Sequence, residues 1–163
     1  MLIDVEHEDT FTRMYILFDQ TAHVVREYGD TYLRRKAKLS AIEFIVLQAL
    51  TGHGGTMTPT ELAEWTHTER HNITTLVYRM SKEGLISTER NSRDRRSVNV
   101  TLTDKGRKVH SQAVPVLRDI VKQVVSSISE SDTALLEKPL NVLWQNAHDG
   151  LEHLAKRAQP QPK

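Results

Sequence analysis

Apolar residues recur every three or four positions along much of this chain, a spacing that places them on one face of a helix. The first stripe predicts a long N-terminal helix, and its members are Phe11, Met14, Phe18, Ala22, Val25, Tyr28 and Tyr32. A second stripe follows Ser40-Ala41-Ile42-Glu43, which has the form of a helix capping box. Two C-terminal stripes predict a helix from Thr103-Asp104, with a kink at Pro115, and a last helix from near Ser129.

Two short helices are predicted in the middle of the chain. The first begins at Thr58-Pro59-Thr60-Glu61, which combines a capping threonine, a proline at the first helical position and a glutamate three residues on. The second covers residues 69–83 and is expected to end at Gly84, a suitable left-handed C-terminal cap. Its start is open, because either Thr66, through Thr66-x-x-Glu69, or Thr68 can serve as the cap.

After Gly84 the apolar period changes from 3.6 to two. Val98, Val100 and Leu102 alternate with polar residues, as in a half-buried strand, and residues 85–90 are the expected hairpin partner across a turn at residues 91–96. Two short helices followed by a hairpin form the order of a winged helix–turn–helix. The predicted fold class is therefore mainly α (α+β), with a winged helix–turn–helix DNA-binding lobe and long flanking helices.

Composition narrows the class further. The chain has 163 residues, 38% apolar and 26% charged, which suits a globular domain, and it has no cysteine, so thiol redox sensing and disulfides within the chain are excluded. No apolar run is long enough to cross a bilayer, and the acidic N-terminus lacks the features of a signal peptide. A cytoplasmic protein with no membrane partner is expected.

Positive charge is concentrated in one segment. The net charge is only +1, yet residues 66–108 contain ten Lys or Arg against five Asp or Glu, so this segment carries +5 and the remainder −4. A basic segment in an otherwise acidic chain is typical of nucleic-acid contact, although a solvated charged face would look the same.

The second short helix carries polar side chains suited to reading base edges in the major groove of DNA. Asparagine and arginine pair with adenine and guanine, and threonine contacts a thymine methyl group or a phosphate. The candidate contacts are Arg70, His71, Asn72, Thr74, Thr75 and Arg79. A generic amphipathic helix remains the alternative for this segment taken alone.

The hairpin turn favours DNA binding more strongly. Arg90, Arg93, Arg95 and Arg96 crowd a short turn in which only Asp94 offers a negative charge. Such repulsion gains an isolated domain nothing, whereas the negative potential of a narrow minor groove attracts inserted arginine. We expect Asp94 to pair with Arg96 and to orient its guanidinium group.

These motifs resemble the MarR family of bacterial and archaeal transcriptional regulators. The resemblance covers nearly the whole chain and is carried by Leu62-Ala63-Glu64, Asn72-Ile73-Thr74-x-Leu76-Val77-x-Arg79-Met80, Glu83-Gly84-Leu85-Ile86, Asp94-Arg95-Arg96 and Leu102-Thr103-x-x-Gly106. It implies a homodimer on double-stranded DNA with a palindromic operator, control by a small effector, and insertion of Arg96 into the minor groove. The implied domains are an N-terminal dimerisation helix (1–38), the DNA-binding lobe (39–106), C-terminal dimerisation helices (107–158) and a disordered tail (159–163).

Relatives in this family bind small aromatic or anionic effectors between the dimerisation region and the lobe. The candidate effector residues in this chain are His23, Arg26, Tyr32, Arg34 and Trp65, each of which also has an ordinary structural interpretation. Repression is the expected mode of regulation.

Metal binding and catalysis have less support. His67 and His71 are four residues apart, but a third ligand is not evident, and His23 and His110 lie on the long helices where some relatives bind zinc. No metal site and no cofactor are therefore predicted. No phosphate loop or nucleophile motif is present, so the protein is not expected to be an enzyme. The alternatives are a zinc-responsive regulator of the same fold and a winged-helix protein-interaction module without DNA binding.

Overall fold

The structure is a computed structural model that describes residues 9–90 and 98–157 of the chain. The described elements, in order, are α1 (Thr10–Ala37), α2 (Ala41–Gly52), β1 (Thr56–Met57), α3 (Pro59–Thr66), α4 (Arg70–Lys82), β2 (Ile86–Arg90), β3 (Val98–Leu102), α5 (Asp104–Val125) and α6 (Glu130–Arg157). The predicted wing residues Arg93, Asp94, Arg95 and Arg96 and the predicted disordered tail lie outside the described residues.

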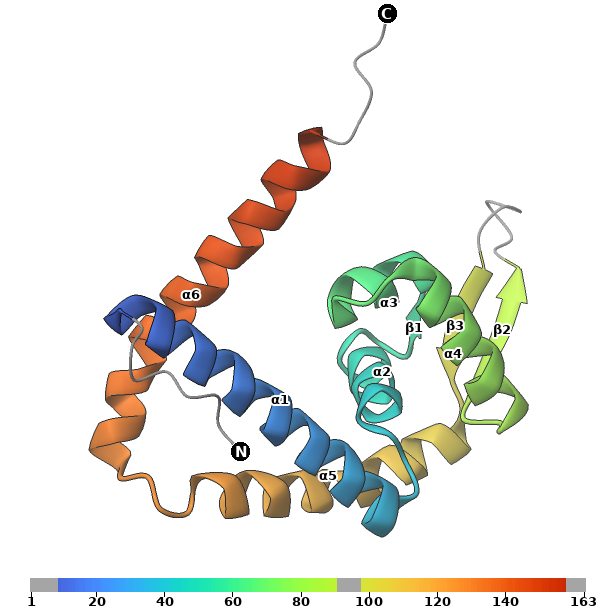
Figure 1. Cartoon of the computed structure of the whole chain (residues 1–163). Helices are drawn as coiled ribbons and strands as arrows, with labels where there is room; N and C mark the ends of the chain where they lie inside the picture. Colours follow the sequence, from blue (N-terminus) through green and yellow to red (C-terminus); the bar gives the residue numbers. More distant parts are fainter. Residues whose placement is uncertain (1–8, 91–97, 158–163) are drawn as a thin grey trace, which may run out of the picture. The chain divides into compact units, whose positions relative to one another are not determined.

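The chain divides into two compact units, Met1–Val124 and Val125–Lys163. In the first unit, α2, α3 and α4 lie beside a small antiparallel sheet (Figure 1). The predicted fold class is confirmed: the chain is mainly helical and contains a winged helix–turn–helix lobe. Within the described part of the chain, no helix is long and apolar enough to cross a membrane.

The sheet contains one strand more than the sequence pattern predicted. Its strand order is β1-β3-β2, with Ile86 opposite Leu102 and Arg90 opposite Val98 in the hairpin. The additional strand β1 has only two residues and pairs Met57 with Val100. Two residues are too few to show a strand period, which explains why the pattern did not reveal it.

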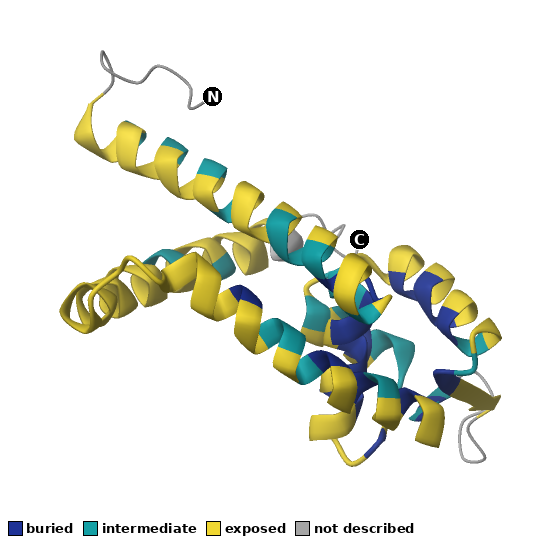
Figure 2. Cartoon of the chain, turned by 90° about the horizontal axis from the view of Figure 1, so that it is seen from below, coloured by how far each residue is buried: buried dark blue, intermediate teal, exposed yellow. Residues whose placement is uncertain are grey.

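The core of the first unit lies where α2, α3 and α4 meet the sheet. Val46, Leu47, Leu62, Ile73 and Val100 are fully buried. Figure 2 shows buried residues gathered in this lobe, whereas the N-terminal part of α1 is mostly exposed. The expected apolar stripe of α1 therefore packs only at its C-terminal end, where Tyr28 and Tyr32 contact the core and Leu33 is buried.

The sequence motifs predicted the starts of α2 and α3 correctly. Ser40 and Thr58 each form a complete capping box, with Glu43 and Glu61 respectively. The expected cap of α4 was wrong, because Thr66 is still inside α3 and the Thr68 hydroxyl donates to the Thr66 carbonyl. Glu69 occupies the N-cap position of α4 and makes no side-chain capping hydrogen bond there.

The later elements follow the predicted pattern. Gly84 has a φ of 71°, as expected for the residue that ends α4. Helix α5 continues through Pro115, and α6 contains a proline of its own, Pro139. In the second unit, Ser129 caps α6 by accepting a hydrogen bond from the backbone N–H of Asp132. Among its side chains that the structure describes, only Leu143 and His148 are half-buried, and the rest are exposed.

Candidate nucleic-acid interface

Helices α3 and α4 form a helix–turn–helix with a tight connection. His67 ends α3 in a left-handed conformation with a φ of 49°, and the N–H of Thr68 donates to the carbonyl of Ala63 over 3.0 Å. Leu62 on α3 and Ile73 on α4 are both fully buried, so the two helices share the core of the lobe. This packing fixes which face of α4 is left for a partner.

The exposed face of α4 carries the side chains that the sequence predicted for DNA contact. Ile73, Leu76, Val77 and Met80 face the core, and the exposed residues are Arg70, His71, Asn72, Thr74, Thr75, Tyr78, Arg79 and Lys82. Tyr78 was not among the predicted contacts; it is 64% exposed, and its ring centroid lies 5.3 Å from the Lys82 ammonium group. The feature of the sequence that could have identified Tyr78 is its position among polar residues on the outward face of α4.

Local hydrogen bonds restrict several of these side chains. The Thr74 hydroxyl donates to the Arg70 carbonyl over 3.0 Å, and the Thr75 hydroxyl donates to the His71 carbonyl over 3.2 Å. These bonds hold both threonine side chains against the helix and engage their hydroxyl protons. The Arg70 guanidinium donates to the Thr60 hydroxyl on α3. The first turns of α4 therefore present a polar surface whose rotamers are partly fixed before any partner binds.

Arg79 differs from the other predicted DNA contacts. Its Nε and Nη2 atoms donate to Glu43 Oε1 on α2, over 3.1 and 2.9 Å. Arg79 lies in the C-terminal half of α4, whereas recognition helices usually contact base edges with their N-terminal residues. The structure thus gives Arg79 a partner within the lobe.

The described part of the wing consists of its two strands. Arg90, the last residue of β2, is exposed and opposite Val98 at the start of β3. Both strands are anchored in the three-stranded sheet, where β3 is the central strand. The predicted pairing of Asp94 with Arg96 falls outside the described residues and stays a prediction.

The five predicted effector residues do not form one site. His23, Arg26 and Arg34 are exposed on α1, with Arg34 paired to Asp30 over 2.6 Å, and the hydroxyl of Tyr32 accepts a hydrogen bond from Gln123 over 3.3 Å. The ring of Trp65 on α3 is nearly perpendicular to that of His53, and the two ring centroids are 6.1 Å apart. It lines a hollow of about 570 Å³ together with Thr56, Met57, Glu61 and Glu64, and none of the other four candidates lines that hollow.

The histidines predicted as possible metal ligands are also separated. His67 caps the end of α3, whereas His71 lies on α4, so the two are not on one helix. His110 is buried on α5, where its Nε2 atom lies 2.8 Å from Gln48 Oε1 and its ring stacks on Phe44. Among the described residues, no group of three or more histidine or carboxylate side chains is arranged to hold a metal ion.

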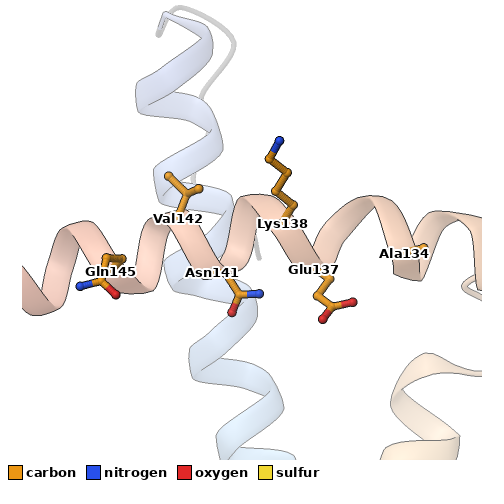
Figure 3. A pocket seen from close by; sticks show the side chains of 6 residues that line it. All are labelled: Ala134, Glu137, Lys138, Asn141, Val142 and Gln145. Carbon is orange, nitrogen blue, oxygen red and sulfur yellow. The ribbon is translucent and has the colours of Figure 1, made fainter.

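A second hollow, of about 400 Å³, lies along α6. All six lining residues come from this one helix, and Lys138 and Val142 point away from Glu137 and Asn141 (Figure 3). Side chains that diverge from a single helix do not form a converging set of ligand-binding groups. The α6 hollow is therefore not the functional site.

The helix–turn–helix with its hairpin, and the polar outer face of α4, define the class of winged-helix transcriptional regulators. Residues 37–97 match the family model described as MarR family. The chain is 25% identical over 134 residues to the organic hydroperoxide resistance transcriptional regulator of Bacillus subtilis, covering 82% of this chain and 88% of that protein. The resemblance to MarR family transcriptional regulators that the motifs predicted is thus confirmed.

Solved structures agree with this assignment. The ligand-free organohalide-sensing regulator RdhR-CbdbA1625 aligns with a TM-score of 0.80 and 26% identity, over 98% of this chain and 94% of that chain. The same regulator has also been solved with 2,4-dichlorophenol bound. Sco3205 of Streptomyces coelicolor, a MarR family regulator solved in complex with DNA, aligns with a TM-score of 0.77 over 83% of this chain and 86% of that chain; at 22% identity this likeness concerns the fold.

Proposed function

We propose that this protein is a DNA-binding transcriptional repressor that acts as a homodimer on a pseudo-palindromic operator. One observation carries the proposal: the first turns of α4 present a polar, partly preorganised surface, while the opposite face of the helix is buried in the lobe. Such a helix fits the major groove, where each base pair shows a distinct pattern of donors and acceptors. Operator binding would place the protein in the cytoplasm, and the proposed role is not enzymatic.

Within α4, we assign base and phosphate contacts to the residues of its first two turns. These residues are Arg70, His71, Asn72, Thr74 and Thr75. Asn72 is suited to a bidentate contact with adenine, and the outward threonine methyl groups are suited to thymine, because the threonine hydroxyl protons are engaged in the helix. Tyr78 lies farther along the same exposed face and is an additional candidate for a phosphate contact.

The wing adds a second contact to the proposal. Arg90 is exposed at the end of β2, and the sequence continues into Arg93, Asp94, Arg95 and Arg96. A minor-groove contact by Arg96, oriented by Asp94, would account for this run of like charges. In that case Arg96→Ala weakens operator binding, and binding equal to wild type would exclude the wing contact.

Exposed apolar surface supports the homodimer. Phe11 is 80% exposed on α1, and Leu135 and Leu151 are 73% and 67% exposed on α6. Large apolar side chains that remain in water on several helices mark an interaction surface. A symmetric dimer would then place two α4 helices in successive major grooves, about one helical turn apart.

Control by a small effector is the remaining part of the proposal. A structural relative binds 2,4-dichlorophenol, which supports an aromatic ligand of this type for the present chain. A relative is named for organic hydroperoxide resistance, but this chain has no cysteine, so a thiol of its own cannot sense an oxidant. Repression relieved by an aromatic or anionic effector is therefore the proposed mode.

The test is a binding titration with a fluorescent DNA duplex from the region upstream of the protein's own gene. Asn72→Ala should weaken binding by roughly 1–3 kcal/mol and relax specificity at one base position in each half-site. Asn141→Ala, an exposed asparagine on α6, is the matched control and should bind like wild type. If Asn72→Ala retains both affinity and base preference, α4 does not read the operator through this residue.

A further inference from the structure

The first turn of α2 joins three helices through hydrogen bonds to its polar groups. Glu43 Oε2 accepts hydrogen bonds from the backbone N–H and the hydroxyl of Ser40, both over 2.7 Å, while Oε1 accepts the two bonds from Arg79 on α4. One carboxylate thus caps α2 with one oxygen and holds α4 with the other. The second task is independent of helix capping.

Helix α1 reaches the same turn from the other side. Asp30 Oδ1 on α1 accepts a hydrogen bond from the backbone N–H of Ala41, the first residue of α2, over 2.7 Å. Asp30 Oδ2 accepts the bond from Arg34 Nε over 2.6 Å. The chain turns between α1 and α2 at Lys38, which has a left-handed φ of 58°. Both the long helix and α4 are therefore tied to residues 40–43.

Disruption of the contact between Glu43 and Arg79 should destabilise the lobe, because the carboxylate is buried. The side chain of Glu43 is only 9% exposed, whereas that of Arg79 is 52% exposed. Burial alone would raise the pKa of Glu43, but the hydrogen bonds from Ser40 and the bonds and charge of Arg79 outweigh it and hold the pKa below its ordinary value. Removal of Arg79 would leave a buried charge with fewer partners.

The position of Arg79 along α4 argues against base reading. It lies nine residues after Arg70, or about 13 Å along the axis at 1.5 Å per residue. Two of its donors already bind a carboxylate, which neutralises the charge that a phosphate contact would use. Arg79 is thus placed to hold α4 against the lobe while the helix N-terminus remains free for DNA.

We propose that Glu43 is a positioning residue for operator binding: it fixes the orientation of α4 through Arg79, at the same turn of α2 that is tied to α1, and Arg79 does not contact DNA. The inference rests on the proposed DNA-binding function. It reassigns one predicted DNA contact and adds a residue, Glu43, that lies outside the helix–turn–helix.

The experiment compares Glu43→Gln, Arg79→Gln and the double variant by DNA titration over a series of salt concentrations. If the pair positions α4, each single variant should lose roughly tenfold in operator affinity, and the double variant should be no weaker than the singles. The slope of log affinity against log salt should stay unchanged, because no phosphate contact is removed. Arg79→Lys, which retains the charge, should recover part of the loss.

A phosphate contact by Arg79 would give a different set of results. If Arg79 contacts phosphate, Arg79→Gln should reduce the salt slope by about one unit per protomer, while Glu43→Gln should bind at least as tightly as wild type because it frees the guanidinium group. That combination would overturn the proposal. Affinity for unrelated DNA should be preserved in the singles if only positioning is lost, which separates the effect from unfolding.

A measurement without DNA keeps this inference separate from the proposed function. Amide hydrogen exchange in α4 should accelerate in Glu43→Gln, since the helix loses its link to α2. Glu61→Gln is the matched control, because Glu61 forms the same kind of capping box with Thr58, and the structure shows no bond from it to α4. Unchanged exchange in Glu43→Gln would exclude the positioning role, whereas a wild-type protein that fails to bind DNA would overturn the proposed function alone.

Discussion

Glu43 and His110 are both buried ionisable residues, and their surroundings favour opposite charge states. Glu43 accepts hydrogen bonds and an ion pair, so its ionised form is stabilised. His110 is stacked on Phe44 and beside Gln48, and burial lowers its pKa below the ordinary 6.5. The neutral imidazole is therefore the form that the folded protein favours.

This environment predicts a pH dependence of stability. The unfolded chain binds a proton at His110 near pH 6.5, while the folded chain resists it, so the free energy of unfolding should fall as the pH falls from 6.5 toward the lowered pKa. The stabilisation is fully present above pH 6.5. Urea unfolding between pH 5.5 and 7.5 should show this slope in wild type and a smaller slope in His110→Gln. His71→Gln, at an exposed position on α4, should keep the wild-type slope.

Sequence reasoning at the residue scale succeeded where the signal was local. The period of α4 identified its outward side chains, because burial of Ile73, Leu76 and Met80 determines which neighbours face water. It did not reveal the pairing of Arg79 with Glu43, since these residues are 36 positions apart and each also fits an ordinary local role. Only the packing of α4 against α2 brings them together.

At the scale of elements, the connection between β3 and α5 is constrained by several hydrogen bonds. The Thr103 hydroxyl bonds the carbonyls of Gly84 and Leu85 over 2.8 and 2.9 Å and accepts the N–H of Gly106 over 3.0 Å. Lys105 Nζ also donates to the carbonyl of Glu83 over 2.6 Å. The start of α5 is thus fastened to the end of α4.

Gly106 allows this close approach, and its replacement should be costly. A Cβ atom at position 106 would lie 2.1 Å from the Leu85 carbonyl oxygen, a backbone atom that cannot move aside easily. Gly106→Ala should lower the free energy of unfolding by about 2–3 kcal/mol. Gly52→Ala, which meets no atom within 4 Å at the end of α2, should be neutral or slightly stabilising in the same unfolding measurement. Equal stability of both variants would contradict the steric argument.

The helix starts show why short motifs predict elements unevenly. Ser40 and Thr58 follow residues outside a helix, so their capping boxes form as the sequence indicates. Thr66 has the same spacing to Glu69, but it is still helical, and its hydroxyl donates to the Leu62 carbonyl over 2.7 Å. A four-residue motif does not record where the preceding helix ends, and for that reason the predicted cap of α4 was wrong.

At the scale of the whole molecule, the distribution of apolar and charged residues matters more than their totals. The net charge of +1 conceals a basic segment within a more acidic chain. Apolar side chains remain exposed on α1 and on α6, each within its own unit. Both distributions support the proposed homodimer and its proposed contact with DNA.

The exposed stripe of α1 gives a prediction for assembly. Phe18 is 41% exposed, and Phe18→Asp would place a charge in the proposed dimer interface. The variant should shift the protein toward monomer in sedimentation experiments and should bind the operator at least tenfold more weakly, because one lobe contacts only one half-site. Arg13→Asp, on the opposite side of α1, is the control and should remain dimeric. A dimeric Phe18→Asp variant would exclude this stripe from the interface.

The bonds in and just after the C-terminal half of α4 have a mechanical consequence. Arg79 ties the helix to α2, and the carbonyls of Glu83 and Gly84 at its C-terminal end are bonded to Lys105 and Thr103. A helix restrained in this way has little freedom to tilt on its own, so the lobe should turn as a rigid body. A signal that releases the operator would then act on connections outside the lobe and rotate each lobe of the proposed dimer as a unit. The distance between the two α4 helices would change, while the structure of each helix would stay the same.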